Sequence, residues 1–127
     1  MIYGIGVDIV KIERIRSNIQ RFGERFAQRL LTEAELADYR ATRQPEHLLA
    51  KHFAAKEAVV KALGTGFREG LAFNLIGVDH DHLGKPGIVY SGAALDTIRA
   101  IGITDSLLSL SDEQDYAVAF VILLTSG

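Results

Sequence analysis

The sequence contains no cysteine and no tryptophan, and only one methionine among its 127 residues. The lack of cysteine excludes disulfide frameworks, thiolate metal sites and cysteine nucleophiles. No basic stretch precedes an apolar segment at the N-terminus, and the longest apolar run, residues 116–124, is far shorter than the ~20 residues of a membrane-spanning helix. We therefore expect no secretion signal and no membrane insertion, and we expect the protein to act in the reducing cytoplasm.

Length and apolar content limit the architecture. A chain of 127 residues corresponds to one domain on the usual scale of ~100–200 residues, so we expect a single domain over residues 1–127. Hydrophobic residues make up 48% of the chain, which excludes disorder as the main state. Because so small a domain has little interior, this composition favours burial of some apolar surface against another copy of the chain.

The charges divide unevenly along the chain. The net charge of −2 argues against a general nucleic-acid-binding protein. Residues 1–68 hold twelve basic and eight acidic side chains (net +4), whereas residues 69–127 hold two basic and eight acidic ones (net −6). The basic half indicates either a local anionic partner or an ordinary solvated helix surface, and composition does not choose between them.

Residues 2–10 are rich in isoleucine and valine and predict a strand. Successive side chains of a strand point to opposite faces, so Gly4, Gly6 and Asp8 share one face, where the lack of glycine side chains predicts open space beside the carboxylate. Isoleucine and phenylalanine then recur at helical spacing and predict one helix over residues 12–26, with a polar, basic stripe beside the apolar one.

Two further helices follow. Thr32 and Glu35 match a capping box, which predicts a helix near residues 33–43. Pro45 suits the first turn of the next helix, which continues until Gly64 ends it.

The second half predicts mostly strands. In chain order we expect strands at residues 73–80 and 87–90 joined by a turn, a helix ended by Gly102, and strands at 103–110 and 116–124. The whole pattern predicts an α+β fold, in which a small, mainly antiparallel sheet packs on the long helix that ends at Leu63. The first strand, the central hairpin and the last two strands would form this sheet. The last strand is apolar throughout and should be central or buried at an interface.

Asp8, Glu57 and Lys61 are the candidate functional residues. Glu57 and Lys61 are four apart and lie on one stripe of their helix. Asp8 and Glu57 would supply two hard oxygen ligands of the kind that Mg²⁺ takes, and Lys61 could reach a phosphate oxygen of the same substrate. The alternatives are a surface ion pair between Glu57 and Lys61 and a helix-capping role for Asp8.

Three blocks of sequence carry a family resemblance. They are Gly4-Ile5-Gly6-Val7-Asp8-Ile9-Val10 with Glu13-Arg14-Ile15, Phe53-Ala54-Ala55-Lys56-Glu57 with Lys61-Ala62-Leu63-Gly64-Thr65-Gly66, and Gly84-Lys85-Pro86. In this order and at this spacing they resemble the holo-acyl-carrier-protein synthases, which are phosphopantetheinyl transferases, over nearly the whole chain.

The resemblance implies an activity. It is the Mg²⁺-dependent transfer of the phosphopantetheine arm of coenzyme A to a serine of apo acyl carrier protein, with release of adenosine 3′,5′-bisphosphate, in support of fatty acid biosynthesis. Asp8 and Glu57 match the family's magnesium-binding carboxylates, and Lys61 matches the lysine at the coenzyme A phosphates. The proton of the serine would pass to Glu57 or to a water on the metal, and the sequence does not choose.

The resemblance also implies binding partners. The basic stripe that includes Arg14, Arg21 and Arg25 matches the family's helix that docks the acidic carrier protein. Family members are typically trimers with an active site at each subunit interface, which implies a homotrimer with the last strand at its core. The matched positions expected to contact coenzyme A, besides Lys61, are Gly64, Lys85 and Pro86, and for Lys85 a plain surface turn is the alternative.

Two positions depart from the family pattern. His52 stands where many members carry Arg, so a contact to the nucleotide would be weaker or pH-dependent. Asp112 lies where many members have a Ser-His-Thr-like triplet, which removes a phosphate-facing donor. The alternative function is a non-catalytic module that binds coenzyme A or a carrier protein, with Asp8, Glu57 and Lys61 as a structural ion network.

Overall fold

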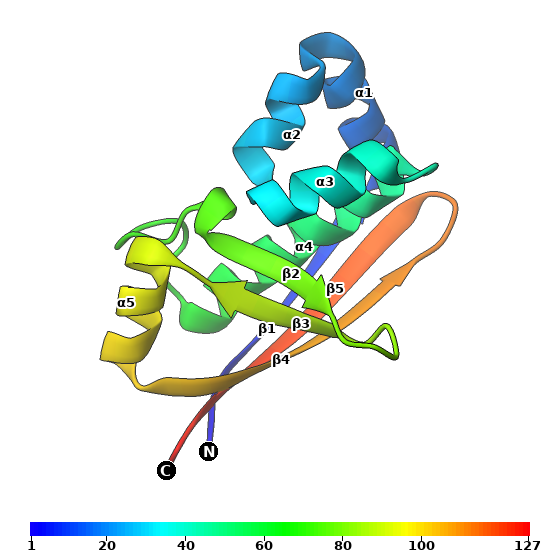
Figure 1. Cartoon of the computed structure of the whole chain (residues 1–127). Helices are drawn as coiled ribbons and strands as arrows, with labels where there is room; N and C mark the ends of the chain where they lie inside the picture. Colours follow the sequence, from blue (N-terminus) through cyan, green and yellow to red (C-terminus); the bar gives the residue numbers. More distant parts are fainter.

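Two antiparallel sheets and five α-helices make up the computed structural model, which describes all residues from Met1 to Gly127 (Figure 1). The larger sheet has the order β1-β5-β4, and these strands span Ile2–Lys11, Tyr116–Thr125 and Ile103–Asp112, respectively. The smaller sheet is the hairpin of β2 (Ile76–His80) and β3 (Pro86–Tyr90). The predicted α+β class with antiparallel strands is confirmed.

The central hairpin is separate from the larger sheet, so the prediction of one sheet is wrong. β3 lies beside β4, but side chains join the two strands in place of a backbone ladder. One such contact is between the hydroxyl oxygens of Tyr90 and Ser106, which are 2.7 Å apart. β2 also begins later than predicted, because a short 3₁₀ turn, η1 (Phe73–Leu75), precedes it.

The longest helix covers one face of the larger sheet, the first three helices lie together at one end of the molecule, and the last helix lies apart from them beside β3 and β4 (Figure 1). The helices are α1 (Ile12–Phe22), α2 (Glu24–Leu30), α3 (Glu33–Ala41), α4 (Pro45–Leu63) and α5 (Gly92–Ile101). The single helix predicted over residues 12–26 is wrong, because Gly23 has a φ of 64° and breaks it into α1 and α2. No helix is both long and apolar enough to cross a bilayer.

The predicted helix ends that depend on local signals are confirmed. The Glu35 N–H donates to Thr32 Oγ1 at 3.2 Å, and the Thr32 N–H donates to Glu35 Oε1 at 2.8 Å, which completes the capping box. Gly64 and Gly102 follow α4 and α5 in the left-handed conformation that glycine favours at this position.

The two glycines of β1 bring that strand against α4. A Cβ at Gly4 would lie 2.1 Å from the Ala62 carbonyl oxygen, and one at Gly6 would lie 1.9 Å from the Ala58 carbonyl oxygen. The open space expected beside these glycines is therefore wrong, because the helix backbone fills it. Asp8 follows on the same face of β1 and so lies over the same helix.

β5 is the central strand of the larger sheet, as predicted, and its two faces differ. One face presents small and medium side chains, among them Ala117, Ala119 and Val121, which are fully buried toward α4. The opposite face is apolar but uncovered, and we call it the outer sheet face. Its exposed members are Ile5, Val7, Ile9, Leu107, Tyr116 and Phe120.

Candidate functional site

Asp8, Glu57 and Lys61 meet where β1 lies against α4. The Lys61 ammonium donates to Asp8 Oδ1 at 2.9 Å and to the Val7 carbonyl oxygen at 3.2 Å. Lys61 is therefore paired with Asp8, and the alternative ion pair between Glu57 and Lys61 does not form. Asp8 does not cap α1 either, because Lys11 is the N-cap residue and has no side-chain hydrogen bond.

The charges of Asp8 and Lys61 both act on the Glu57 carboxyl group. Partial burial raises the pKa of its carboxyl group, the charge on Asp8 raises it further, and the Lys61 ammonium offsets part of this rise. The structure has no group of three or more His, Cys, Asp or Glu side chains that could hold a metal ion. Asp8 and Glu57 are two oxygen ligands of the kind that could hold Mg²⁺, which keeps several waters and substrate oxygens.

Asp8 and Glu57 open into a pocket of about 250 Å³. Arg14 from α1, Phe26 from α2 and Phe53 from α4 also line it. Phe53 in turn stacks on Phe73, with ring centroids 5.5 Å apart, and Phe73 stacks on Phe67 at 3.9 Å. The pocket thus combines two acids, one cation and an aromatic wall. The aromatic wall was not predicted, because Phe26 and Phe53 come from two separate helices.

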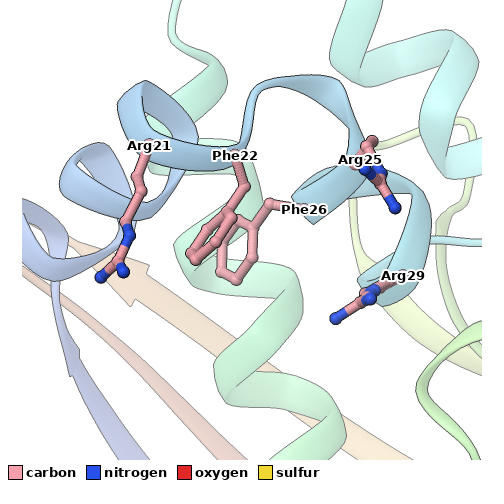
Figure 2. A pocket seen from close by; sticks show the side chains of 5 residues that line it. All are labelled: Arg21, Phe22, Arg25, Phe26 and Arg29. Carbon is pink, nitrogen blue, oxygen red and sulfur yellow. The ribbon is translucent and has the colours of Figure 1, made fainter.

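A larger cavity of about 490 Å³ lies between α1 and α2, with Arg21, Phe22, Arg25, Phe26 and Arg29 around it. Figure 2 shows the two phenylalanine rings between Arg21 on one side and Arg25 and Arg29 on the other. The Arg21 guanidinium also lies 5.1 Å from the centroid of the Phe22 ring.

The prediction of a basic stripe along one helix is wrong. Arg14 and Arg21 lie on α1, but the break at Gly23 moves Arg25 onto α2. The cations therefore surround a hollow instead of following one helix, and Arg29, which was not predicted, joins them. Phe26 lines both this cavity and the Asp8–Glu57 pocket, so the two adjoin.

A buried ion pair that was not predicted stands behind the pocket. Lys56 is fully buried, and its ammonium donates to Glu35 Oε1 at 2.7 Å, to the Phe73 carbonyl oxygen at 2.9 Å and to the Leu30 carbonyl oxygen. The second Glu35 oxygen accepts from the Val78 N–H at 2.9 Å. The ion pair therefore connects α4 to α2, α3, η1 and β2. It also holds the backbone carbonyl of Phe73, whose ring stacks on Phe53.

His52 completes this cluster. Its Nδ1 lies 2.8 Å from Glu35 Oε2, a contact at ion-pair distance that does not have hydrogen-bond geometry. Burial by itself raises the pKa of the Glu35 carboxyl, but His52 and the charge of Lys56 outweigh burial and bring the pKa to about 2. Burial lowers the pKa of the Lys56 ammonium, and Glu35 offsets only part of that effect. His52 is thus held by Glu35.

His52 also lines a small polar pocket of about 130 Å³ with His47, Lys51 and His80. Asp112 pairs with two members of this pocket: its Oδ2 lies 2.8 Å from His47 Nδ1, and its Oδ1 lies 3.6 Å from Lys51 Nζ. Both departures from the family pattern therefore fall at one place, where Asp112 holds two side chains that can carry positive charge.

The predicted coenzyme residues lie in two places. Lys61 and Gly64 are at the C-terminal end of α4. Lys85 lies in the turn between β2 and β3, and Pro86 begins β3 and pairs with His80 of the small polar pocket. Within one chain the structure does not bring Lys85 or Pro86 to the Asp8–Glu57 pocket.

Comparison with known proteins gives consistent matches. The family model described as the 4′-phosphopantetheinyl transferase superfamily matches residues 4–121. A holo-[acyl-carrier-protein] synthase of Halorhodospira halophila is 50% identical over 125 residues, which are 98% of this chain and 99% of that protein.

Two crystal structures of holo-(acyl-carrier-protein) synthases share the fold. The one from Neisseria meningitidis superposes with a TM-score of 0.95 at 46% identity, covering 98% of this chain and 100% of that one. The one from Bacillus anthracis, in complex with CoA (3′,5′-ADP), has a TM-score of 0.83 at 34% identity and covers 99% of each chain.

Proposed function

The chain belongs to the 4′-phosphopantetheinyl transferase superfamily, and on this basis we propose that it transfers the phosphopantetheine arm of coenzyme A to a serine hydroxyl of an apo acyl carrier protein. The observation that carries the proposal is that Asp8 and Glu57 line one pocket, with the Lys61 ammonium bonded to Asp8, beside a cavity ringed with arginines. We place the reaction in the cytoplasm, in support of fatty acid biosynthesis, and assign it to one domain over residues 1–127.

Asp8 and Glu57 would hold a Mg²⁺ ion. When bound, this ion supplies positive charge to the diphosphate of coenzyme A and to the oxygen that leaves. Lys61 adds a second positive charge at the phosphates as a mobile point charge. Gly64 follows Lys61 at the end of α4, where its exposed backbone can contact the coenzyme.

The chemistry is a single displacement at phosphorus. The serine oxygen of the carrier protein forms a bond to the phosphorus of the phosphopantetheine group, and the bond from that phosphorus to the bridging oxygen breaks. The bridging oxygen leaves with the bonding electrons on adenosine 3′,5′-bisphosphate. We assign the serine proton to Glu57, whose carboxylate lines the pocket beside the proposed metal.

The nucleotide end of coenzyme A is assigned to the small polar pocket. Lys51 and Lys61 are ten residues apart on α4, which corresponds to about 15 Å along the helix. Lys85 and Pro86 adjoin that pocket through His80. Coenzyme A carries negative charge at its nucleotide end and on its diphosphate. We assign the nucleotide end to the cations of the small polar pocket and the diphosphate to Lys61, either within one subunit or across a subunit interface.

Product analysis tests the proposed reaction. Incubation with coenzyme A, Mg²⁺ and an apo carrier protein should release adenosine 3′,5′-bisphosphate in amounts equal to the holo carrier protein formed. A chelator should stop the release, and a carrier protein whose acceptor serine is replaced by alanine should give none. Release without the acceptor serine would indicate a coenzyme hydrolase instead.

The arginine-lined cavity is the proposed docking site for the carrier protein. Exchanging Arg25 for Glu should raise the KM for the carrier protein about tenfold with little change in kcat, because a steering attraction becomes a repulsion away from the reacting atoms. Rising ionic strength should weaken wild-type docking in the same direction. Arg99→Glu, which reverses an exposed charge on α5, is the matched control and should leave KM unchanged. Equal effects of both substitutions would contradict this docking site.

We propose that the outer sheet face joins the chain into a homotrimer. Phe120 lies opposite Val7 on the neighbouring strand and is 40% exposed in the single chain. Phe120→Glu should dissociate the assembly, because an interface would have to bury an unpaired charge. Light scattering should then give the 13.9 kDa of one chain instead of three times that mass. Leu83→Glu, at an exposed leucine in the β2–β3 turn, is the control and should leave the trimer intact.

A further inference from the structure

The Lys61 ammonium is paired with the carboxylate of Asp8, one of the two proposed metal ligands. It donates to Asp8 Oδ1 at 2.9 Å, and the Val7 carbonyl oxygen takes a second donor at 3.2 Å. Asp8 is largely buried, with 14% of its side chain exposed, whereas 53% of the Lys61 side chain is exposed. The carboxylate is therefore neutralised by a group that itself remains in contact with solvent.

Only one of these two partners can move easily. Asp8 pairs with Ala119 of β5, and Gly6, two residues earlier, packs directly on the backbone of α4, so the backbone of Asp8 is held in place. Lys61 carries its charge on a flexible four-carbon stem in the last turn of α4, and most of that stem borders solvent. A change of partner at this site must therefore be a movement of Lys61.

We propose that Lys61 is a place-holder for the metal, which neutralises Asp8 until a divalent cation displaces it and thereby frees the ammonium for the coenzyme phosphates. This inference rests on the proposed metal site at Asp8 and Glu57. It predicts that Lys61 competes with the metal when no coenzyme is bound. A bound phosphate that attracts the ammonium removes this competition, so metal and coenzyme should strengthen each other's binding by the same factor.

Binding of Mn²⁺ to the full chain without coenzyme tests this exchange. Measured by the loss of the free-ion electron paramagnetic resonance signal, the affinity of Lys61→Gln should be about tenfold higher than that of the wild type, within the usual range of such couplings. Lys61→Arg keeps the positive charge and should bind Mn²⁺ as weakly as the wild type. Lys11→Gln, the same substitution at an exposed lysine at the end of β1, should leave the affinity unchanged.

Addition of adenosine 3′,5′-bisphosphate completes the test. Measured against a protein-free sample of Mn²⁺ and the bisphosphate, it should tighten Mn²⁺ binding to the wild type by a larger factor than to Lys61→Gln, because only the wild type also loses the competing ammonium. If the wild type binds one Mn²⁺ and Lys61→Gln binds it no more tightly, the exchange is wrong while the metal site stands. If none of the proteins binds Mn²⁺, or if Asp8→Asn binds it as well as the wild type, the proposed metal site itself fails.

Discussion

Replacing Glu57 by Gln is expected to slow phosphopantetheine transfer by at least about 100-fold without destabilising the fold. The loss follows because glutamine supplies neither a charged metal ligand nor a proton acceptor to the reacting phosphate. Stability should be equal or slightly higher. The raised pKa of Glu57 means that the folded state disfavours its ionised form, so at neutral pH the charge lowers stability, and a neutral side chain of the same shape removes this penalty.

Steady-state rates and chelator-treated thermal unfolding measure the two effects on the same samples. Glu46→Gln, which removes a carboxyl from the first turn of the same helix, is the control and should keep the wild-type rate. A Glu57→Gln variant that loses several kcal/mol of stability would favour the alternative reading of Asp8, Glu57 and Lys61 as a structural ion network in a binding module.

Replacing Glu35 by Gln is expected to lower the free energy of unfolding by about 3–5 kcal/mol, because it leaves the Lys56 ammonium buried without its counter-charge. Lys56 has no exposed surface, and two backbone carbonyls are its remaining partners. Urea unfolding at neutral pH measures the loss. Glu33→Gln, at an exposed position two residues earlier in α3, should cost at most a few tenths of a kcal/mol. Equal stability of the two variants would show that the ion pair contributes little.

Acid should weaken the same pair. The pKa of Glu35 is about 2 in the folded protein, below the ~4.3 of a free glutamate. Its contribution to stability is therefore complete above the unfolded-state pKa and is lost as the pH falls through that value toward the folded pKa. Denaturation curves recorded between pH 5 and pH 2 should show wild-type stability falling toward that of Glu35→Gln.

Local signals in the sequence were sufficient to locate most helix ends. The capping box at Thr32 and the left-handed glycines at Gly64 and Gly102 depend on a few adjacent residues, and the structure confirms all three. Gly23 was equally local, but the regular spacing of isoleucine and phenylalanine across it outweighed the glycine in the prediction. The consequence is large, because the break turns a basic stripe into a cavity.

Long-range contacts account for what the sequence did not predict. Gly4 and Gly6 suggested open space, and only their pairing with α4 shows that they allow close approach. Lys56 and Glu35 are each ordinary surface residue types, and their burial depends on five elements meeting at one point. The sequence identified Asp8, Glu57 and Lys61 together as one site. Helical periodicity offered Glu57 as an ion-pair partner of Lys61, whereas in the structure Lys61 pairs with Asp8 on another element.

The most direct test of the proposed reaction is the intact mass of an apo acyl carrier protein after incubation with this protein, coenzyme A and Mg²⁺. We expect a gain of one phosphopantetheine group on the acceptor serine. A chelator should abolish this gain, and the Glu57→Gln substitution should slow it by at least about 100-fold. An unchanged mass across several apo carrier proteins, under conditions in which coenzyme A binds, would contradict the assignment as a transferase and leave a binding module.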